Sequence, residues 1–317
     1  MTISVLLIIV GFTSLIFGAN WLVDGASSLA KKNNVSDLVI GLTIVAFGTS
    51  APELVVNIVA SFNGHSDIVF GNIIGSNNFN LFVILGIAGL IYPITVQSST
   101  AWKEIPISFI VTVLLLVLAN DFFINQDPEF SRVDGMIFLV GFICFIYYVF
   151  TQLKQEKVEM TAYVEKSNYR IWSLVLIGIA GLIIGGKLVV DNSIDIATEL
   201  GVSQKIIGLT IIAAGTSLPE LVTSIVAALK RNSDIAIGNV IGSNIFNILF
   251  ILSISSFISP IKYNPNFNQD LFILIGGTVV LIITMFTGKR KKLDRWEALI
   301  LLSFYLIYTT YLVSKEL

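Results

Sequence analysis

Apolar stretches of about 20 residues alternate with short polar segments along almost the whole chain. A helix of this length matches the hydrocarbon thickness of a bilayer, because a helix rises about 1.5 Å per residue. The pattern predicts ten membrane-spanning helices whose ends are placed to within a few residues. These predicted spans cover residues 3–30, 37–63, 68–92, 102–124, 133–152, 171–198, 205–229, 234–259, 270–287 and 295–314.

The polar segments between the spans are short, and the longest runs from Gln152 to Arg170 with charges of both signs. None is long enough to form a separate folded domain. We therefore expect one transmembrane unit, divided into residues 1–152, a linker at 153–170 and residues 171–317. No basic residue precedes the first apolar stretch and no small-residue cleavage pattern follows it, so we expect this stretch to be a retained helix rather than a signal peptide.

The two halves of the chain repeat one another at an offset of 167 residues. The alignment runs without a gap from Gly11 with Gly178 to Pro93 with Pro260, and more than half of positions 41–93 are identical to their partners. Equivalent spans lie five helices apart, an odd number, so the second copy would cross the membrane in the opposite sense. Inverted repeats of this kind recur in secondary transporters, with the binding site near the midplane. The predicted fold is an all-α integral membrane protein with ten transmembrane helices in two inverted five-helix repeats.

One polar motif interrupts the second and the seventh span: Gly-Thr-Ser-Ala-Pro-Glu at 48–53 and Gly-Thr-Ser-Leu-Pro-Glu at 215–220. Proline lacks an N–H and clashes with the carbonyl four residues earlier, so both helices should break here. Carboxylates and bare carbonyls at this depth are tolerated only where they line a cavity or bind something. Carbonyls at the end of a half-helix suit a cation. The candidate oxygens belong to Ala46, Thr49, Ser50, Glu53, Ala213, Thr216, Ser217 and Glu220.

A second duplicated motif, Gly-Asn-x-Ile-Gly-Ser-Asn, opens the third and the eighth span. Its glycines, four residues apart, allow close helix approach. Ser76 and Asn80 share one helix face, as do Ser243 and Asn247, and we expect the third and eighth helices to be interrupted near them as well. Hydroxyl, amide, carbonyl and carboxylate oxygens together suit hard cations such as Ca²⁺, and Na⁺ also accepts them. Neither motif contains the Cys or His that would favour soft metals.

Structural roles compete with these assignments. An intramembrane glutamate can be a satisfied helix–helix partner, and the motif threonines can bond to their own helix. Asp24 and Asp191 lie near helix ends, where they can cap a helix or line a vestibule. Asn77 and Asn244 point away from the Asn80 face and are interpreted as helix–helix bonds.

Composition and charge agree with a membrane protein. The chain is 55% hydrophobic and 13% charged, whereas soluble domains carry about 25% charged residues. Basic residues gather in the loops after odd-numbered spans, for example at Lys31 and Lys32 and at 289–292. The positive-inside rule then places both termini outside a cell membrane and the 153–170 linker in the cytoplasm. The chain contains a single cysteine, Cys144, so no intrachain disulfide can form, and nothing in the sequence indicates nucleic-acid binding.

The two motifs and their duplication resemble the alpha-repeats of the cation/calcium exchanger superfamily, in particular those of prokaryotic sodium/calcium exchangers. The resemblance implies an antiporter rather than an enzyme, without a cofactor and functional as a monomer. It implies four clustered cation sites that hold one Ca²⁺ or up to three Na⁺ by turns. Glu53 and Glu220 would bind both ions, and Thr49 and Thr216 would offer backbone oxygens to Ca²⁺. Flanking Na⁺ sites would use the Ala46 and Ala213 carbonyls and the hydroxyls of Ser50, Ser76, Ser217 and Ser243, with Asn80 and Asn247 lining the centre.

Many relatives carry Asp at the position of Asn247, so this chain departs from their pattern. Its predicted cage has two carboxylates, which neutralise one Ca²⁺. The departure argues against potassium co-transport and, more weakly, against proton coupling through this residue.

Alternating access is the mechanism that these features favour, with Na⁺ and Ca²⁺ competing for overlapping oxygens. A Ca²⁺/H⁺ antiporter of the same fold remains an alternative, because buried carboxylates can carry protons. A cation channel is a second alternative, since two helix breaks could form a filter. An intramembrane enzyme is disfavoured, because one histidine and one cysteine supply no plausible nucleophile and base.

Overall fold

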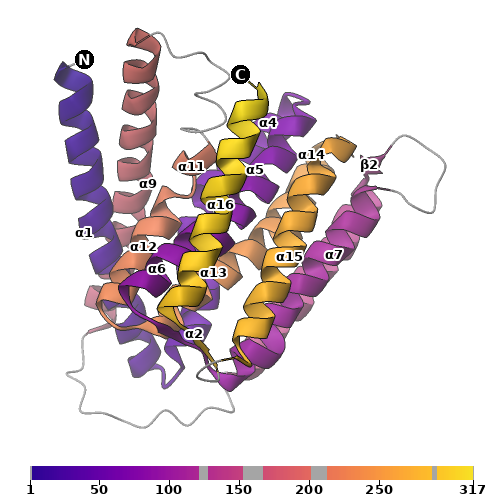
Figure 1. The fold of residues 1–317 in the computed structure, drawn as a ribbon. Coiled ribbons are helices and arrows are strands. Elements are labelled where there is room, and N and C mark those ends of the chain that lie inside the picture. The colour runs from indigo at the N-terminus through magenta and orange to yellow at the C-terminus, as the bar shows by residue number, and fades with distance from the viewer. Residues whose placement is uncertain (1, 121–127, 153–166, 201–212, 288–290, 317) are drawn as a thin grey trace.

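Long helices lie side by side in the structure (Figure 1). This computed structural model describes residues 2–120, 128–152, 167–200, 213–287 and 291–316. Within the described residues, seven helices are long and apolar enough to cross a membrane. An eighth span is obtained if the bent pair Asp37–Thr49 and Ala51–Phe62 counts as one. The predicted all-helical membrane architecture is therefore confirmed at this level.

The first half of the chain contains helices that follow the predicted spans closely. In chain order its elements are α1 (Thr2–Lys32), α2 (Asp37–Ile40), the π-helical turn η1 (Gly41–Val45), α3 (Ala46–Thr49), α4 (Ala51–Phe62), α5 (Ser66–Asn78), η2 (Phe79–Ile84), α6 (Leu85–Ile91), β1 (Ile94–Thr95), η3 (Thr100–Glu104), α7 (Ile105–Ala119), β2 (Glu129–Phe130) and α8 (Arg132–Gln152).

The second half repeats this order. It contains α9 (Asn168–Glu199), α11 (Ala213–Gly215), α12 (Leu218–Leu229), α13 (Ser233–Phe246), η5 (Asn247–Ile251), α14 (Leu252–Ile258), β3 (Ile261–Lys262), η6 (Pro265–Phe267), α15 (Asn268–Thr284), β4 (Lys292–Leu293) and α16 (Arg295–Glu316). Residues 205–212 of the predicted seventh span and most of the predicted linker lie outside the described residues.

The second span bends where the proline motif predicts a break. The helical segment Asp37–Thr49 and α4 are bent by 48° on either side of Ser50, and Pro52 lies in the first turn of α4. In the second half, α11 ends at Gly215 and α12 begins at Leu218 with Pro219 in its first turn. The third and eighth spans differ from the prediction, since Ser66–Ile91 and Ser233–Ile258 each remain one continuous helix. Their amide residues lie in π-helical turns rather than in a break, because no proline interrupts the backbone hydrogen bonding there.

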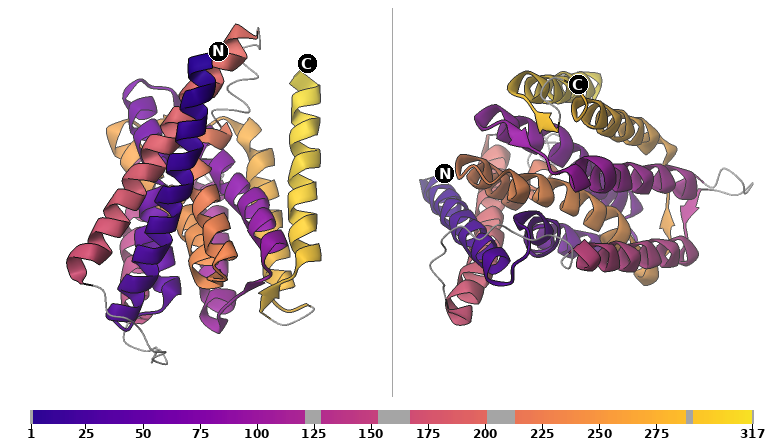
Figure 2. Two further views of the ribbon diagram at one scale, coloured as in Figure 1. Left: turned by 90° about the vertical axis from the view of Figure 1, so that its left-hand side faces the viewer. Right: turned by 90° about the horizontal axis from the view of Figure 1, so that it is seen from below.

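The two longest helices, α1 and α9, cross in direct backbone contact, as Figure 2 shows. A Cβ atom added to Gly18 would lie 2.8 Å from the Gly178 carbonyl oxygen, and one added to Gly178 would lie 2.8 Å from the Gly18 oxygen. Gly11 and Gly185 form the same reciprocal contact at 2.9 and 2.7 Å. Glycine is needed at these four positions because any side chain would separate the helices.

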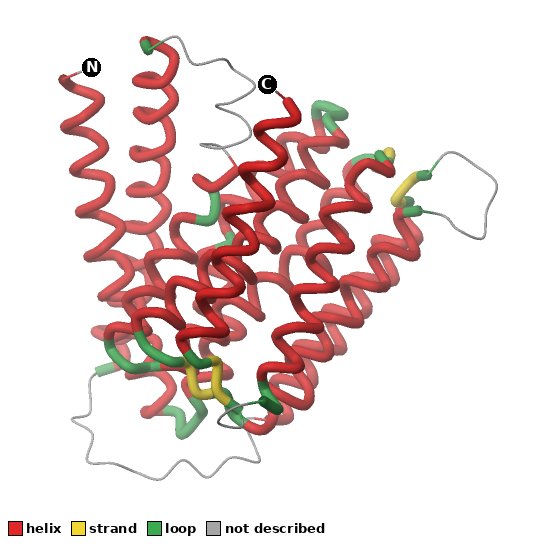
Figure 3. Tube along the Cα trace, in the orientation of Figure 1, coloured by secondary structure: helices red, strands yellow, loops and turns green. Residues whose placement is uncertain are grey.

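Short strands and a buried helix complete the scaffold. Two antiparallel pairs, β1 with β4 and β2 with β3, lie at opposite ends of the bundle (Figure 3). α13 is buried almost throughout, and it packs so closely on the second span that a Cβ at Gly242 would lie 2.8 Å from that of Ala46. The close approach predicted from the Gly-xxx-Gly spacing is therefore confirmed for Gly238 and Gly242. By the repeat, the residues expected to contact Gly71 and Gly75 lie at 205–213, and the side chains of that segment are not described.

Candidate cation site

The two helix breaks bring two buried carboxylates to the centre of the fold. Glu53 and Glu220 lie in the first turns of α4 and α12, directly after the prolines that start these helices. Their exposed fractions are 1% and 0%. Buried carboxylates are costly unless they are paired, hydrogen-bonded or bound to a cation.

Each carboxylate accepts a hydrogen bond from the serine of the other motif. Ser50 Oγ donates to Glu220 Oε1 at 2.8 Å, and Ser217 Oγ donates to Glu53 Oε1 at 3.2 Å. The two motifs, 167 residues apart in sequence, therefore face each other directly. The second oxygen of each carboxylate, Oε2, is buried and has no hydrogen-bond partner.

Two asparagines of the third and eighth spans are held with their oxygen atoms free. Asn80 donates from Nδ2 to Asn244 Oδ1 at 3.0 Å, and Asn247 donates from Nδ2 to Asn77 Oδ1 at 3.0 Å. The Oδ1 atoms of the same two side chains, Asn80 and Asn247, are buried and have no hydrogen-bond partner. An amide fixed by its nitrogen presents its oxygen, which is the atom that a cation needs.

Asn77 and Asn244 also bond to each other's backbone, as the sequence predicts for helix–helix partners. Asn77 Nδ2 donates to the Asn244 carbonyl at 3.2 Å, and Asn244 Nδ2 donates to the Asn77 carbonyl at 3.3 Å. Their second role, orienting the Asn80 and Asn247 amides, is missed by sequence reasoning. The available signal was an asparagine repeated three residues before another asparagine in both copies.

Six buried oxygens of the predicted site thus lack a hydrogen-bond partner. Fourteen buried side-chain polar atoms in the described residues are in this state. Leaving such an atom unsatisfied costs about 1–3 kcal/mol, so their concentration on duplicated positions makes these oxygens candidate cation ligands. Ca²⁺ takes 6–8 oxygens. The six atoms are the Oε2 atoms of Glu53 and Glu220, the Oγ atoms of Ser76 and Ser243, and the Oδ1 atoms of Asn80 and Asn247.

The threonine and alanine positions show a mixed result. Thr49 Oγ1 lies 3.1 Å from the carbonyl of Val45 on its own helix and 2.9 Å from Asn239 Oδ1. The Ala46 carbonyl, which the sequence predicts to lack a helical partner, accepts the Ser50 N–H at 3.0 Å. This expectation was wrong because the chain keeps one further helical hydrogen bond before the bend. Thr216 Oγ1 donates to Asn72 Oδ1 at 3.3 Å, while the side chain of Ala213 at the start of α11 is not described.

Two more asparagines that sequence reasoning passed over support the glutamates from behind. Asn72 Nδ2 lies 2.9 Å from Asn57 Oδ1 and 3.5 Å from the Glu53 carbonyl. In the second copy, Asn239 donates to the Glu220 carbonyl at 3.2 Å. Each asparagine therefore joins the helix of the Ser–Asn face to the helix that carries the carboxylate. Their duplication directly after a glycine was the signal.

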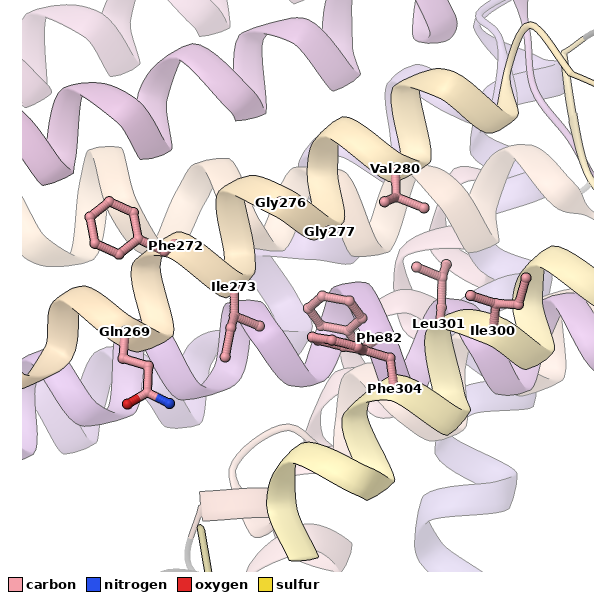
Figure 4. Close-up of a pocket in the computed structure, with 10 residues that line it drawn as sticks. All are labelled: Phe82, Gln269, Phe272, Ile273, Gly276, Gly277, Val280, Ile300, Leu301 and Phe304. Carbon is pink, nitrogen blue, oxygen red and sulfur yellow. The ribbon is translucent and has the colours of Figure 1, made fainter. Parts of the chain in front are cut away.

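A large groove among the described residues lies elsewhere and has a different chemistry. A groove of about 640 Å³ opens between α15 and α16, with Phe82 at its side (Figure 4). It is lined by Gln269 and nine nonpolar residues, including Phe272 and Phe304. A groove without charged groups is unsuited to a dehydrated cation. In the described part of the chain no three His, Cys, Asp or Glu residues cluster.

Buried oxygens that converge between two broken helices of a membrane protein are typical of ion transporters. Residues 3–151 and 170–314 match the family model described as sodium/calcium exchanger protein, and the chain belongs to this family. The resemblance expected from the motifs is thereby confirmed. The family consists of membrane exchangers, not enzymes.

Individual relatives cover nearly the full chain. The chain is 36% identical to the putative antiporter CaxA of Alkalimonas amylolytica over 99% of its length and all of CaxA. It is 33% identical to the sodium/calcium exchanger MaX1 of Methanosarcina acetivorans, with 97% of both chains covered. A structure of the sodium-calcium exchanger NCX_Mj soaked with Na⁺ and Sr²⁺ superposes with a TM-score of 0.83 at 31% identity, covering 96% of this chain and 97% of that one.

Proposed function

We propose that this protein is a secondary active antiporter that exchanges Na⁺ for Ca²⁺ across the membrane by alternating access. The observation that carries the proposal is the set of six buried, unpartnered oxygens at duplicated positions. Membership of the sodium/calcium exchanger family supports the choice of ions.

In the proposed site, Ca²⁺ lies between Glu53 and Glu220, and the two negative charges neutralise it. The Oδ1 atoms of Asn80 and Asn247 face the same position, because their nitrogens are engaged by the opposite repeat. Backbone oxygens of Thr49 and Thr216 complete the Ca²⁺ site. The flanking Na⁺ sites use Ser50, Ser76, Ser217, Ser243, Ala46 and Ala213.

The proposed membrane arrangement has ten spans in two inverted repeats, residues 1–152 and 171–317. Reciprocal hydrogen bonds between equivalent residues, such as Asn77 with Asn244, support a two-fold relation between the copies. Both termini face outward and the 153–170 linker lies in the cytoplasm of a cell whose plasma membrane holds the protein as a monomer.

Alternating access follows from the cost of an empty site. Two uncompensated carboxylates are expensive to enclose in a low-dielectric interior, so the protein crosses between its two states only when cations occupy the cage. The helices α1 and α9 slide against the core formed by the second, third, seventh and eighth spans. An exchange of about three Na⁺ for one Ca²⁺, as in the resemblance, moves net charge, and an inward Na⁺ gradient drives Ca²⁺ out.

The test is ⁴⁵Ca²⁺ uptake into Na⁺-loaded proteoliposomes at clamped pH, compared with liposomes loaded with choline. We expect uptake that requires internal Na⁺ and increases with a positive internal potential. Uptake that ignores Na⁺ but follows a pH gradient would establish the Ca²⁺/H⁺ alternative. Efflux of ⁴⁵Ca²⁺ that continues without external Na⁺ or Ca²⁺ would instead identify a channel.

A further inference from the structure

The two copies of the repeat differ in how their first long helix packs on the core. α1 lies against α12, whereas α9, the equivalent of α1, has no comparable packing along α4, the equivalent of α12. Identical residues report the difference: Val226 on α12 is 6% exposed, while Val59 at the same position of α4 is 53% exposed. α12, the helix that carries Glu220, is therefore covered by α1, and α4, the helix that carries Glu53, is left uncovered by α9.

At the covered end, the loop 230–232 holds α1 by side-chain contacts. Lys230 Nζ lies 2.8 Å from Asp24 Oδ1 and 3.1 Å from the carbonyl oxygen of Asn20, both on α1. Asn232 Nδ2 lies 3.0 Å from Ser27 Oγ, also on α1. The loop directly follows α12, so these contacts fasten α1 to the core helix that it covers.

The other copy has no equivalent of this ion pair. The repeat replaces Lys230 by Asn63, and in the described chain no ion pair or side-chain hydrogen bond joins Asn63 to Asp191, the counterpart of Asp24. Backbone shape is shared, since Arg231 and its counterpart Gly64 have φ of 57° and 70°. A non-glycine residue in this region is strained, and Arg231 compensates by lying 5.8 Å from the ring centroid of Tyr92. Of the two equivalent loops, the strained one is 230–232, which carries Lys230.

We infer that Asp24 and Lys230 form a latch that keeps α1 over α12 and so closes the route to the cation site at the end of the fold where loop 230–232 lies. This inference rests on the proposed alternating access. Sliding α1 away from α12 separates the two charges, so every transport cycle must break the ion pair and form it again. Because the described residues form no such pair between α9 and the loop after α4, the latch weights the two access states unequally in favour of the state that is closed at loop 230–232.

The size of the bias follows from the exposure of the pair. The side chains of Lys230 and Asp24 are 30% and 53% exposed, so solvent screens their attraction. Exposed ion pairs shift an equilibrium about twofold to fivefold. Since ligand binding from one face requires the state open to that face, the apparent Ca²⁺ affinities at the two faces should change in opposite directions.

The experiment measures the half-saturating Ca²⁺ concentration of Na⁺-dependent exchange separately at each face, in right-side-out and inside-out vesicles. The variants are Lys230→Gln, Asp24→Asn, the two combined, and the charge exchange Asp24→Lys with Lys230→Asp. Asp191→Asn is the matched control, because it removes the equivalent carboxylate at the end without a latch.

For either single variant we expect a twofold to fivefold increase in apparent affinity at the loop 230–232 face relative to the opposite face. The combined variant should shift no further than the single ones, and the charge exchange should restore the original ratio. The latch would be overturned if the single variants keep exchange but leave the ratio of Ca²⁺ affinities at the two faces unchanged. It would also be overturned if the two single effects multiply in the combined variant, or if Asp191→Asn shifts the ratio equally. Loss of Na⁺ dependence in the unaltered protein would overturn the proposed function instead.

Discussion

The orientation of the Asn80 amide depends on Asn244, and Asn244→Ala tests whether that orientation matters for Ca²⁺. The change deletes the acceptor that holds Asn80 Nδ2 at 3.0 Å and the donor to the Asn77 carbonyl at 3.3 Å. Each such hydrogen bond stabilises by about 0.5–1.5 kcal/mol. Without its anchor the Asn80 amide can rotate and present nitrogen to the ion. Loss of one such bond from the ion-ready state corresponds to about a twofold to tenfold weaker Ca²⁺ affinity.

The assay is the half-saturating Ca²⁺ concentration for Na⁺-driven ⁴⁵Ca²⁺ uptake, with the Ca²⁺-dependent rise in melting temperature as a binding measurement that needs no transport. Asn78→Ala is the control. It removes an equally buried asparagine from the helix that carries Asn80, with its hydrogen bond to the Asp270 carbonyl, and among the described residues that side chain forms no hydrogen bond with either cage amide. The reasoning is refuted if Asn244→Ala leaves both measurements unchanged, or if Asn78→Ala weakens Ca²⁺ binding equally.

Two further predictions concern the carboxylates and the helix crossing. Glu53→Gln and Glu220→Gln should each reduce Na⁺-driven Ca²⁺ uptake more than tenfold and remove the Ca²⁺-dependent rise in melting temperature, because one charge cannot balance a divalent ion. Full exchange in either variant would show that the substituted glutamate is not a central ligand. Gly178→Ala should destabilise the fold by about 1–3 kcal/mol, since its Cβ would lie 2.6 Å from the Leu22 nitrogen, whereas Gly276→Ala meets no atom within 4 Å. Equal melting temperatures for these two alanine variants would contradict the backbone contact.

The sequence was sufficient for the features that repeat locally. Pro52 predicts the bend at Ser50, because a missing N–H acts on its own helix. The duplicated Ser and Asn positions predict a set of cation ligands at equal depth in the two copies, and this assignment stays a prediction. Ser76 and Asn80 are examples, and both carry unpartnered buried atoms.

What the sequence could not supply depends on contacts between helices. The use of the Asn80 nitrogen by Asn244 is visible only when the two copies are docked, since the residues are 164 positions apart. The hydroxyl of Thr49 illustrates the same limit, because it is shared between its own helix and Asn239 of the opposite repeat. Periodicity likewise gave no sign that Asn80 begins a π-helical turn instead of a break, as that depends on how the surrounding helices hold the backbone.

The glycine crossing of α1 and α9 has a mechanical consequence. The helices touch backbone to backbone at Gly11 with Gly185 and at Gly18 with Gly178, with Ser14 Oγ bonded to the Gly181 carbonyl between these points. These three contacts hold α1 and α9 together at their crossing, so the two helices are expected to move as one rigid unit. Under the proposed alternating access, a tilt of this pair that moves α1 away from α12 would also move α9 at the opposite end. In the proposed exchanger, access from both ends at once would require α1 and α9 to separate, so these four glycines would limit leakage although they carry none of the proposed ion ligands.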